Sequence, residues 1–343
     1  MQEEKKKSRK EGDKARLAAA AARLGVLQRR LKDEKIPVII TFDGFDAAGK
    51  GLQISRLIQA LDPRGFEVFA NSKATEEEQL RPFLWRFWTK TPEAGRIAIF
   101  DGSWYRKVLI DRFEKRTREK EIETAFHSIE AFEKQLTDGG TILVKLLLDI
   151  DQKEQKKRFE KLLEKKETAW RVSQGDRERN AKYSEYAAMM EEVLYRSDTK
   201  SAPWTVIEAT DRRFATVKIY MTVIHALAEA VEAVQRRRME EQAIKAAEQV
   251  SGQQEAAEIM RQAGGELEML QSSVLSRADL TLAYGKEEYE KRLKKLQKKI
   301  EKLHGEVYRR RIPVVIGFEG WDAGGKGGAI KRLTEKMDPR GYV

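Results

Sequence analysis

The chain has 343 residues, 41% of them hydrophobic and 36% charged, which allows about two domains with a core each and argues against wholesale disorder. It contains no cysteine and three scattered histidines, so a disulfide-stapled fold and thiolate metal chemistry are excluded. Lys and Arg outnumber Asp and Glu by 67 to 56. This surplus favours a polyanionic partner, but it does not choose among nucleic acid, an anionic membrane and a phosphate-rich substrate.

The sequence shows neither a membrane span nor a secretory signal. The longest apolar run, 142–148, is interrupted by Lys145 and falls far short of the ~20 residues that cross a bilayer. Residues 1–10 are mostly charged, unlike a signal peptide. No segment interleaves aromatic and basic residues as nucleic-acid-binding modules do. We therefore expect no membrane partner, no nucleic-acid partner and a cytoplasmic location.

The predicted elements begin with a basic helix within 1–35, followed by a first domain over 36–235. Short, β-branched apolar runs are typical of strands buried on both faces of a parallel sheet, and they occur at 38–42, 97–100, 142–148 and 205–207. Helical periodicity marks 52–61, 121–136 and 152–163 between them. This alternation predicts an α/β fold, a doubly wound parallel sheet with ligands at the carboxyl ends of its strands.

The remainder of the chain repeats the beginning. A linker rich in Ala, Glu, Gln and Arg is predicted to be helical over 236–271. Residues 312–341 match residues 36–65 at 18 of 30 positions without a gap. We interpret 272–343 as the start of a second, truncated copy of the domain, with its first strand and helix.

A phosphate-binding loop follows the first strand. Residues 44–51 read Gly-Phe-Asp-Ala-Ala-Gly-Lys-Gly and satisfy the first seven positions of the Walker A pattern. Glycines let backbone N–H groups wrap a phosphate, the following helix adds its positive end, and the lysine adds a mobile charge. The second copy repeats the loop, with Asp322 and Lys326 as its acid and its lysine. The residues predicted to bind phosphate in the first copy are Gly44, Ala47, Ala48, Gly49, Lys50 and Gly51.

Two aspartates are predicted to hold a metal ion. Gly51 stands where the pattern usually has the Ser or Thr that holds Mg²⁺. Asp46 lies inside the loop, and a carboxylate beside a phosphate cradle indicates a divalent cation between them. Asp101 follows the strand 97–100, at the place of the Walker-B carboxylate, although a helix cap is the alternative reading. The sequence therefore predicts a Mg²⁺ cofactor held by Asp46 and Asp101.

Further segments resemble polyphosphate kinase family 2, and the tandem duplication resembles its two-domain class. These segments are DPRG at 62–65, FLWRFW at 83–88, FDGSWY at 100–105, QKKRF at 155–159, AWRVSQGD at 169–176 and APWTVIEATD at 202–211. The resemblance covers nearly the whole first domain and implies a P-loop kinase-like fold with a helical lid over about 155–196. It also implies phosphoryl transfer from inorganic polyphosphate to a nucleotide, with AMP converted to ADP in the two-domain class.

The resemblance also implies roles for individual residues. Lys50 would bind the transferring phosphate while Asp46 and Asp101 hold Mg²⁺, and these three are the expected catalytic residues. Such a site works by positioning and by neutralising charge. Polyphosphate and a nucleotide are the expected partners, and self-association into a homo-oligomer is left open. Arg158 and Arg171 of the lid would bind polyphosphate. Trp104 and Arg106, which follow Asp101, would bind the nucleotide.

Three positions depart from the family pattern. Where the family carries a cation, this chain has Gly102, Thr168 and Thr216. Each change removes a positive charge from a site that must neutralise several phosphates. Two alternatives therefore stay open: an ATP-dependent nucleotide kinase on the same fold, against which Gly51 argues, and a catalytically weakened structural domain of a tandem polyphosphate kinase.

Overall fold

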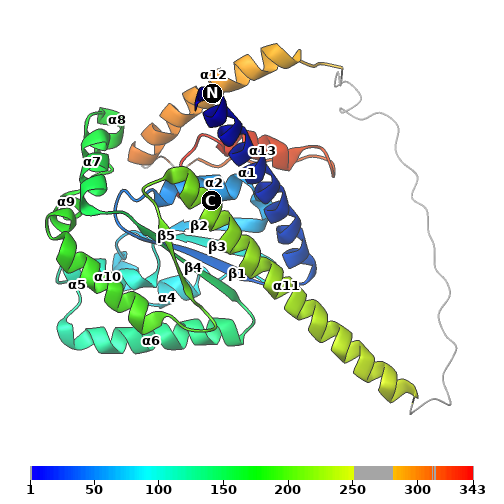
Figure 1. Ribbon diagram of the computed structural model, residues 1–343, viewed down its shortest axis with the longest axis horizontal. Helices are drawn as coiled ribbons and strands as arrows, with labels where there is room; N and C mark the ends of the chain where they lie inside the picture. Colours follow the sequence, from blue (N-terminus) through cyan, green and yellow to red (C-terminus); the bar gives the residue numbers. More distant parts are fainter. Residues whose placement is uncertain (1, 251–280, 311, 313, 343) are drawn as a thin grey trace.

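A five-stranded parallel sheet forms the centre of the molecule (Figure 1). The structure is a computed structural model that describes residues 2–250 and 281–342, apart from 311 and 313. The strand order is β2-β3-β1-β4-β5, which confirms the predicted α/β class with a doubly wound parallel sheet. The strands are β1 (Val38–Gly44), β2 (Phe66–Ala70), β3 (Ile97–Asp101), β4 (Ile142–Asp149) and β5 (Trp204–Glu208).

Strand β2 is the one described strand that the sequence pattern did not predict. It lies at the edge of the sheet and pairs with β3, from Phe66 opposite Ile97 to Ala70 opposite Asp101. Only Phe66 and Val68 are buried in it. An edge strand with one covered face lacks the continuous apolar run by which the inner strands are recognised, so the pattern missed it.

Helices cover both faces of the sheet (Figure 1). Helices α1, α2 and α11 pack together on one face, and α6 with α10 lies on the other. Four helices, α7 to α10, form the segment predicted as a lid. The helices are α1 (Gln2–Asp33), α2 (Lys50–Gln59), α3 (Glu76–Gln79), α4 (Trp85–Trp88), α5 (Ile110–Phe113), α6 (Glu119–Asp138), α7 (Gln152–Leu163), α8 (Lys166–Ala169), α9 (Gln174–Ala181), α10 (Tyr183–Ser197), α11 (Arg212–Val250), α12 (Lys286–Arg310) and α13 (Lys326–Thr334), with short 3-10 turns η1 (Pro63–Gly65), η2 (Trp104–Lys107) and η4 (Pro339–Gly341).

Helix α11 crosses the predicted boundary between domain and linker. Residues 212–240 are long and apolar enough, by length and composition alone, to cross a membrane. In this fold one face of the helix packs against α1, α2, β4 and β5. Fully buried residues recur at every fourth position, the spacing of one helix face, in the series Ala215, Ile219, Val223, Leu227 and Val231. Helix α11 continues to Val250, and the rest of the predicted linker, 251–271, lies outside the described residues.

The second copy forms its helix but not its strand. Helix α13 begins at Lys326 as the repeat predicts, whereas the described residues before it, 312 and 314–320, have no regular structure. Their apolar side chains are exposed, Val315 by 96%. A parallel strand needs neighbours for its backbone hydrogen bonds, and no other strand of this copy is described.

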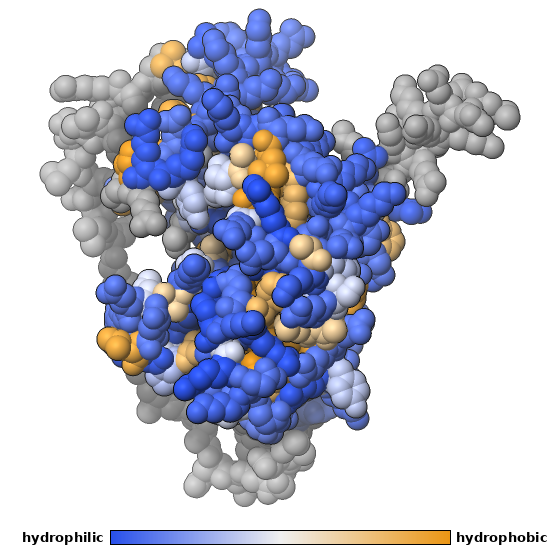
Figure 2. Space-filling view, turned by 90° about the vertical axis from the view of Figure 1, so that its left-hand side faces the viewer, coloured by the Kyte–Doolittle hydropathy of each residue, from blue (hydrophilic) through white to orange (hydrophobic). Residues whose placement is uncertain are grey.

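Hydrophilic residues dominate the face shown in Figure 2, where apolar residues form separated patches. This distribution is consistent with a chain in which 36% of residues are charged.

Candidate active site

The phosphate-binding loop joins the carboxyl end of β1 to the first turn of α2, at the centre of the sheet. Gly44 has φ +118°, and a Cβ atom there would lie 2.2 Å from the carbonyl oxygen of Leu148, so only glycine fits. Gly49 precedes α2 with φ +104°, and Ala47 also has a positive φ, +56°. When residues in the left-handed conformation alternate with residues in the right-handed one, successive backbone N–H groups point into one concavity, as in anion-binding nests. The local backbone therefore suits a phosphate.

The lysine and the aromatic residue of the loop are both anchored. Lys50 Nζ donates to the carbonyl oxygens of Gly44 and Phe45, at 3.0 Å each. The ring of Phe45 stacks on Tyr183 at 4.7 Å and meets Tyr186 edge-on at 6.0 Å. Helix α10 thus fixes the tip of the loop, and the Lys50 ammonium lies folded over the cradle.

Asp101 lies beside the loop because β3 pairs with β1, with Asp101 opposite Phe42. Its carboxylate is 7% exposed, and its Oδ2 lies 3.4 Å from Nε of Arg340 in the second copy. Burial raises the pKa of Asp101, and the Arg340 and Lys50 cations oppose that rise. The ion pair shows that this carboxylate can face a cation, whereas its predicted role as a magnesium ligand stays a prediction.

Asp43 is a buried carboxylate that the sequence reasoning missed. It accepts hydrogen bonds from the backbone N–H of Ser103 at 2.9 Å and from the Ser103 hydroxyl at 2.8 Å. Burial raises its pKa, and the Ser103 hydrogen bonds oppose the rise. Asp43 thereby ties the segment after Asp101 to the strand before the loop. A signal was present, because the second copy also has a carboxylate at this position, Glu319.

Asp46 is held by an arginine of helix α9, within the segment predicted as a lid. Nε of Arg179 donates to Asp46 Oδ2 at 2.7 Å, and Arg179 Nη1 donates to Glu114 at 2.8 Å. Burial would lower the pKa of Arg179, but Asp46 and Asp176 outweigh it and the pKa is raised. Arg179 was not predicted, since one arginine in a lid charged throughout gives no distinct signal. The pair joins helix α9 to the phosphate loop.

Arg158 corrects a sequence-based prediction. Its side chain is 6% exposed, and its guanidinium donates to four backbone carbonyls and a carboxylate rather than facing solvent. A neighbour on the same helix, Gln155, donates to the carbonyl oxygen of Asp46 at 3.0 Å. Arg158 therefore holds the loop in shape and is not free to bind polyphosphate. Its acceptors are Ala47 O and Ala48 O at 3.1 and 2.9 Å, Ala209 O and Thr210 O at 2.8 and 3.0 Å, and Glu154 Oε1 at 2.8 Å.

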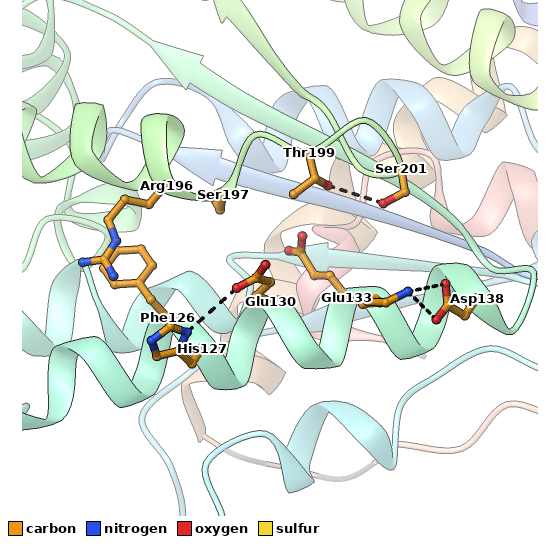
Figure 3. A pocket seen from close by; sticks show the side chains of 10 residues that line it. Phe126, His127, Glu130, Glu133, Asp138, Arg196, Ser197, Thr199 and Ser201 are labelled. Atoms are coloured by element: carbon orange, nitrogen blue, oxygen red, sulfur yellow. Dashed lines mark hydrogen bonds and ion pairs between the residues drawn. The ribbon is translucent and has the colours of Figure 1, made fainter.

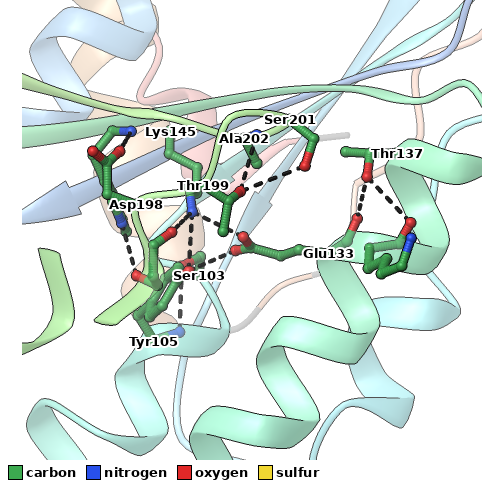
Figure 4. A network of polar contacts seen from close by, with 12 residues as sticks. Ser103, Tyr105, Glu133, Thr137, Lys145, Asp198, Thr199, Ser201 and Ala202 are labelled. Atoms are coloured by element: carbon green, nitrogen blue, oxygen red, sulfur yellow. Dashed lines mark hydrogen bonds and ion pairs between the residues drawn. The ribbon is translucent and has the colours of Figure 1, made fainter. Parts of the chain in front are cut away.

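Trp104 is also corrected, because it is 1% exposed and cannot contact a nucleotide. Its indole N–H donates to Glu133 at 2.8 Å. Glu133 also accepts from Tyr105 and Lys145, in the buried network of Figure 4. Lys145 Nζ donates to Glu133 Oε2 at 2.8 Å and to the Ser197 carbonyl at 2.7 Å. Burial lowers the pKa of Lys145, and Glu133 opposes this. The network fixes the segment after Asp101 against α6 and β4.

Arg106 and Arg171 remain candidates for anion binding. The Arg106 side chain is 19% exposed and lies 3.4 Å from Asp111, and burial lowers its pKa. Arg171 is 41% exposed and lies 3.9 Å from Asp338 of the second copy. Neither side chain has every donor engaged in the way that Arg158 has, so the predicted nucleotide and polyphosphate roles of Arg106 and Arg171 stay predictions.

The structure accounts for the residue present at two of the three positions that depart from the family pattern. Gly102 has φ +78°, a conformation that an arginine would adopt only with strain. Thr216 is 3% exposed, and its hydroxyl oxygen lies 2.9 Å from the Gln53 side-chain oxygen and 2.7 Å from the Arg212 carbonyl oxygen, either of which can accept its one hydrogen. The backbone at 102 and the packing at 216 therefore suit the residues present and not the expected cations.

The second phosphate loop has the backbone of the first. Gly320, Ala323 and Gly325 have φ of +149°, +59° and +82°. Lys326 Nζ donates to the carbonyl oxygens of Gly320 and Trp321, at 2.6 and 2.8 Å. Its acid, Asp322, is exposed. Among the described residues this second loop has no strand beside it and no counterpart of Asp101.

The donors near the first loop suit Mg²⁺ only together with substrate oxygens. Mg²⁺ in phosphoryl-transfer sites takes one or two carboxylates and completes its shell with phosphate oxygens and water. The described residues contain no group of three or more His, Cys, Asp or Glu that could hold a metal ion. The buried carboxylate of Asp101 at the edge of the loop fits this pattern. Asp46 fits less directly, because one of its oxygens accepts from Arg179.

A separate pocket of about 180 Å³ lies between α6 and the segment after α10. Within the pocket His127 lies beside Glu130, and Lys134 pairs with Asp138 (Figure 3). Arg196 pairs with Glu192, which does not line the pocket. No residue of the phosphate loop lines it. The phosphate loop therefore remains the candidate active site.

Known proteins resemble this chain in sequence and in structure. The family model for polyphosphate kinase 2 (PPK2) matches residues 7–237 and 283–343. A polyphosphate:AMP phosphotransferase of Pseudomonas aeruginosa is 33% identical over 92% of this chain, which spans 60% of that relative's length. A GDP-polyphosphate phosphotransferase of Mycolicibacterium smegmatis is 33% identical over 54% of this chain and 66% of its own.

A solved structure described as a polyphosphate kinase 2 from Pseudomonas aeruginosa PA01 superposes with a TM-score of 0.62 at 37% identity. The match covers 65% of this chain and 48% of that one. The family model matches well over half of the residues, in both copies of the phosphate loop. The chain belongs to the polyphosphate kinase 2 family.

Proposed function

We propose that this chain transfers a phosphoryl group from inorganic polyphosphate to a nucleotide, and that the nucleotide is AMP. The observation that carries the proposal is the phosphate loop, with a backbone fixed by Gly44 and Arg158 and with Lys50 folded over the cradle. AMP is favoured because a relative that matches 92% of this chain is named for AMP. A relative matched over a shorter stretch is named for GDP, so the acceptor is the finer part of the proposal.

In this mechanism the chain positions and neutralises the reacting groups. Lys50 would turn from the carbonyls of Gly44 and Phe45 to the transferring phosphate, while the loop N–H groups hold its oxygens. Mg²⁺, when bound, would neutralise phosphate charge, and Asp101 is the residue best placed to hold it. Arg179 keeps Asp46 and the lid against the loop, which excludes water that would otherwise hydrolyse the donor. We also propose a cytoplasmic location.

The test compares donors and acceptors with the purified chain and Mg²⁺. Polyphosphate and ATP are offered separately as donors, each with AMP, ADP, GMP and GDP, and products are separated by anion-exchange chromatography. The proposal expects ADP from AMP with polyphosphate and no comparable product with ATP. Transfer from ATP alone would indicate the ordinary nucleotide kinase, and absence of transfer from either donor would indicate a structural domain.

A further inference from the structure

The two copies of the repeat contact each other reciprocally. The η1 turn of the first copy, Pro63–Gly65, packs against helix α13 of the second, and the η4 turn of the second copy, Pro339–Gly341, packs against α2 of the first. Gln59 and Glu335 hold the same place in the two repeats, and Gln59 Nε2 donates to the Glu335 carbonyl at 3.2 Å. Equivalent residues meet each other only near a two-fold axis. The contact therefore has the form of an isologous interface within one chain.

This interface brings an arginine of the second copy into the first site. Arg340 is held by its own Asp338, with Nε–Oδ1 and Nη2–Oδ2 distances of 3.0 and 2.7 Å. The same Nε lies 3.4 Å from Oδ2 of Asp101. A Cβ atom on Gly51 would lie 3.3 Å from the Arg340 guanidinium carbon. The guanidinium thus lies between the buried carboxylate and the position where a Walker A loop usually carries its metal-holding hydroxyl.

The corresponding arginine of the first copy, Arg64, has no such contact among the described ion pairs. It is held by Asp62 in the same way, with Nε–Oδ1 and Nη2–Oδ2 distances of 3.1 and 2.8 Å. Its side chain is 66% exposed, against 33% for Arg340. Arg64 is therefore a control within the same chain that differs from Arg340 in the contact with Asp101.

We propose that the guanidinium of Arg340 occupies the cation position of the first site and competes there with a divalent metal ion for Asp101. A carboxylate pairs with a guanidinium and ligates a metal through the same oxygen lone pairs. Gly51 has no hydroxyl that could hold the ion elsewhere in the loop. Metal binding at the first site therefore requires Arg340 to leave, so the second copy controls access to the first. The inference rests on the proposed function only for the identity of the ion as Mg²⁺.

The test measures metal binding without any reaction. Mn²⁺, as the probe, is titrated onto the full chain in the presence of inorganic phosphate, which supplies the phosphate oxygens, and without nucleotide or polyphosphate. Free Mn²⁺ is followed by electron paramagnetic resonance. Arg340→Gln should bind Mn²⁺ roughly tenfold more tightly than wild type. The gain should disappear when Asp101→Asn is added, and Arg64→Gln should match wild type. Circular dichroism establishes that each variant is folded.

Equal Mn²⁺ affinity in wild type and Arg340→Gln would overturn the proposal. So would a gain that survives Asp101→Asn, or a gain of the same size in Arg64→Gln. No outcome depends on phosphoryl transfer, so an inactive chain would refute the proposed function and leave this inference standing.

The interface itself can be tested separately because the chain has no cysteine. Gln59→Cys with Glu335→Cys should be joined by a short bismaleimide within one chain, detected by peptide mapping. Gln59→Cys with Tyr195→Cys is the control pair, since Tyr195 is 90% exposed on α10. Equal cross-linking of the two pairs would show that the copies do not meet as described and would overturn the proposal.

Discussion

Arg158 distinguishes a residue that shapes the phosphate loop from one that binds substrate. Arg158→Ala removes a 6%-exposed side chain whose guanidinium donates to four backbone carbonyls. Each buried acceptor left without a donor costs about 1–3 kcal/mol, and water replaces part of that loss. We expect the variant to lose about 3–5 kcal/mol of unfolding free energy. At roughly 2–4 °C per kcal/mol for a domain of this size, the melting temperature should fall by about 6–20 °C.

The matched variant is Arg158→Lys, which keeps the charge but not the planar fork of donors. If Arg158 holds the loop, both variants should melt well below wild type in calorimetry, and both should bind phosphate weakly. If Arg158 served as a polyphosphate-binding charge, Arg158→Lys would retain stability and most of the binding. A change of about 2 °C corresponds to roughly 1 kcal/mol of unfolding free energy. A melting temperature of Arg158→Ala within about 2 °C of wild type would therefore refute the structural role.

Three further variants test the neighbourhood of the loop. Glu133→Gln leaves the buried Lys145 ammonium without its carboxylate and should cost about 3–5 kcal/mol in urea unfolding; a cost below about 1 kcal/mol would contradict a charged buried pair. Burial raises the pKa of Asp43 above 3.8, so the folded chain binds this proton more tightly than the unfolded chain. The stability that this proton contributes is therefore lost as pH rises from 3.8 through the raised pKa. Asp43→Asn should remove this pH dependence of the unfolding free energy. Parallel plots of unfolding free energy against pH for wild type and Asp43→Asn would disprove the raised pKa. Gly44→Ala brings a Cβ atom to 2.2 Å from the Leu148 carbonyl oxygen and should weaken both folding and phosphate binding. A melting temperature equal to that of wild type would show that β1 and β4 can move apart at this position and would contradict the expectation.

The sequence predicted the inner sheet because its strands are buried on both faces and appear as apolar runs. It missed β2, where only Phe66 and Val68 are buried, because an edge strand is not continuously apolar. It also predicted a strand before the second phosphate loop. That strand is not among the described elements, since strand formation depends on neighbours that no local pattern contains.

The candidate site was predictable where chemistry depends on local order, as in the loop that ends at Lys50. Residues that act by tertiary contact were not predictable in the same way. Arg158 and Trp104 have the residue types of ligand-binding groups, yet both are buried by elements distant in sequence. Arg179 and Arg340 reach the site from the lid and from the second copy, and only the folded arrangement shows which of many arginines does so.

The most direct measurement of the central claim is phosphorus NMR of ADP formation from polyphosphate and AMP, comparing wild type, Lys50→Ala and Lys326→Ala. Lys50 lies over a loop supported by β1, β3 and the lid, whereas Lys326 lies in a loop with no described strand beside it. Loss of the loop lysine should cost about 3 kcal/mol of transition-state stabilisation, or roughly a hundredfold in rate. The account predicts that loss in Lys50→Ala and near-wild-type turnover in Lys326→Ala. Undiminished ADP formation by Lys50→Ala would contradict it.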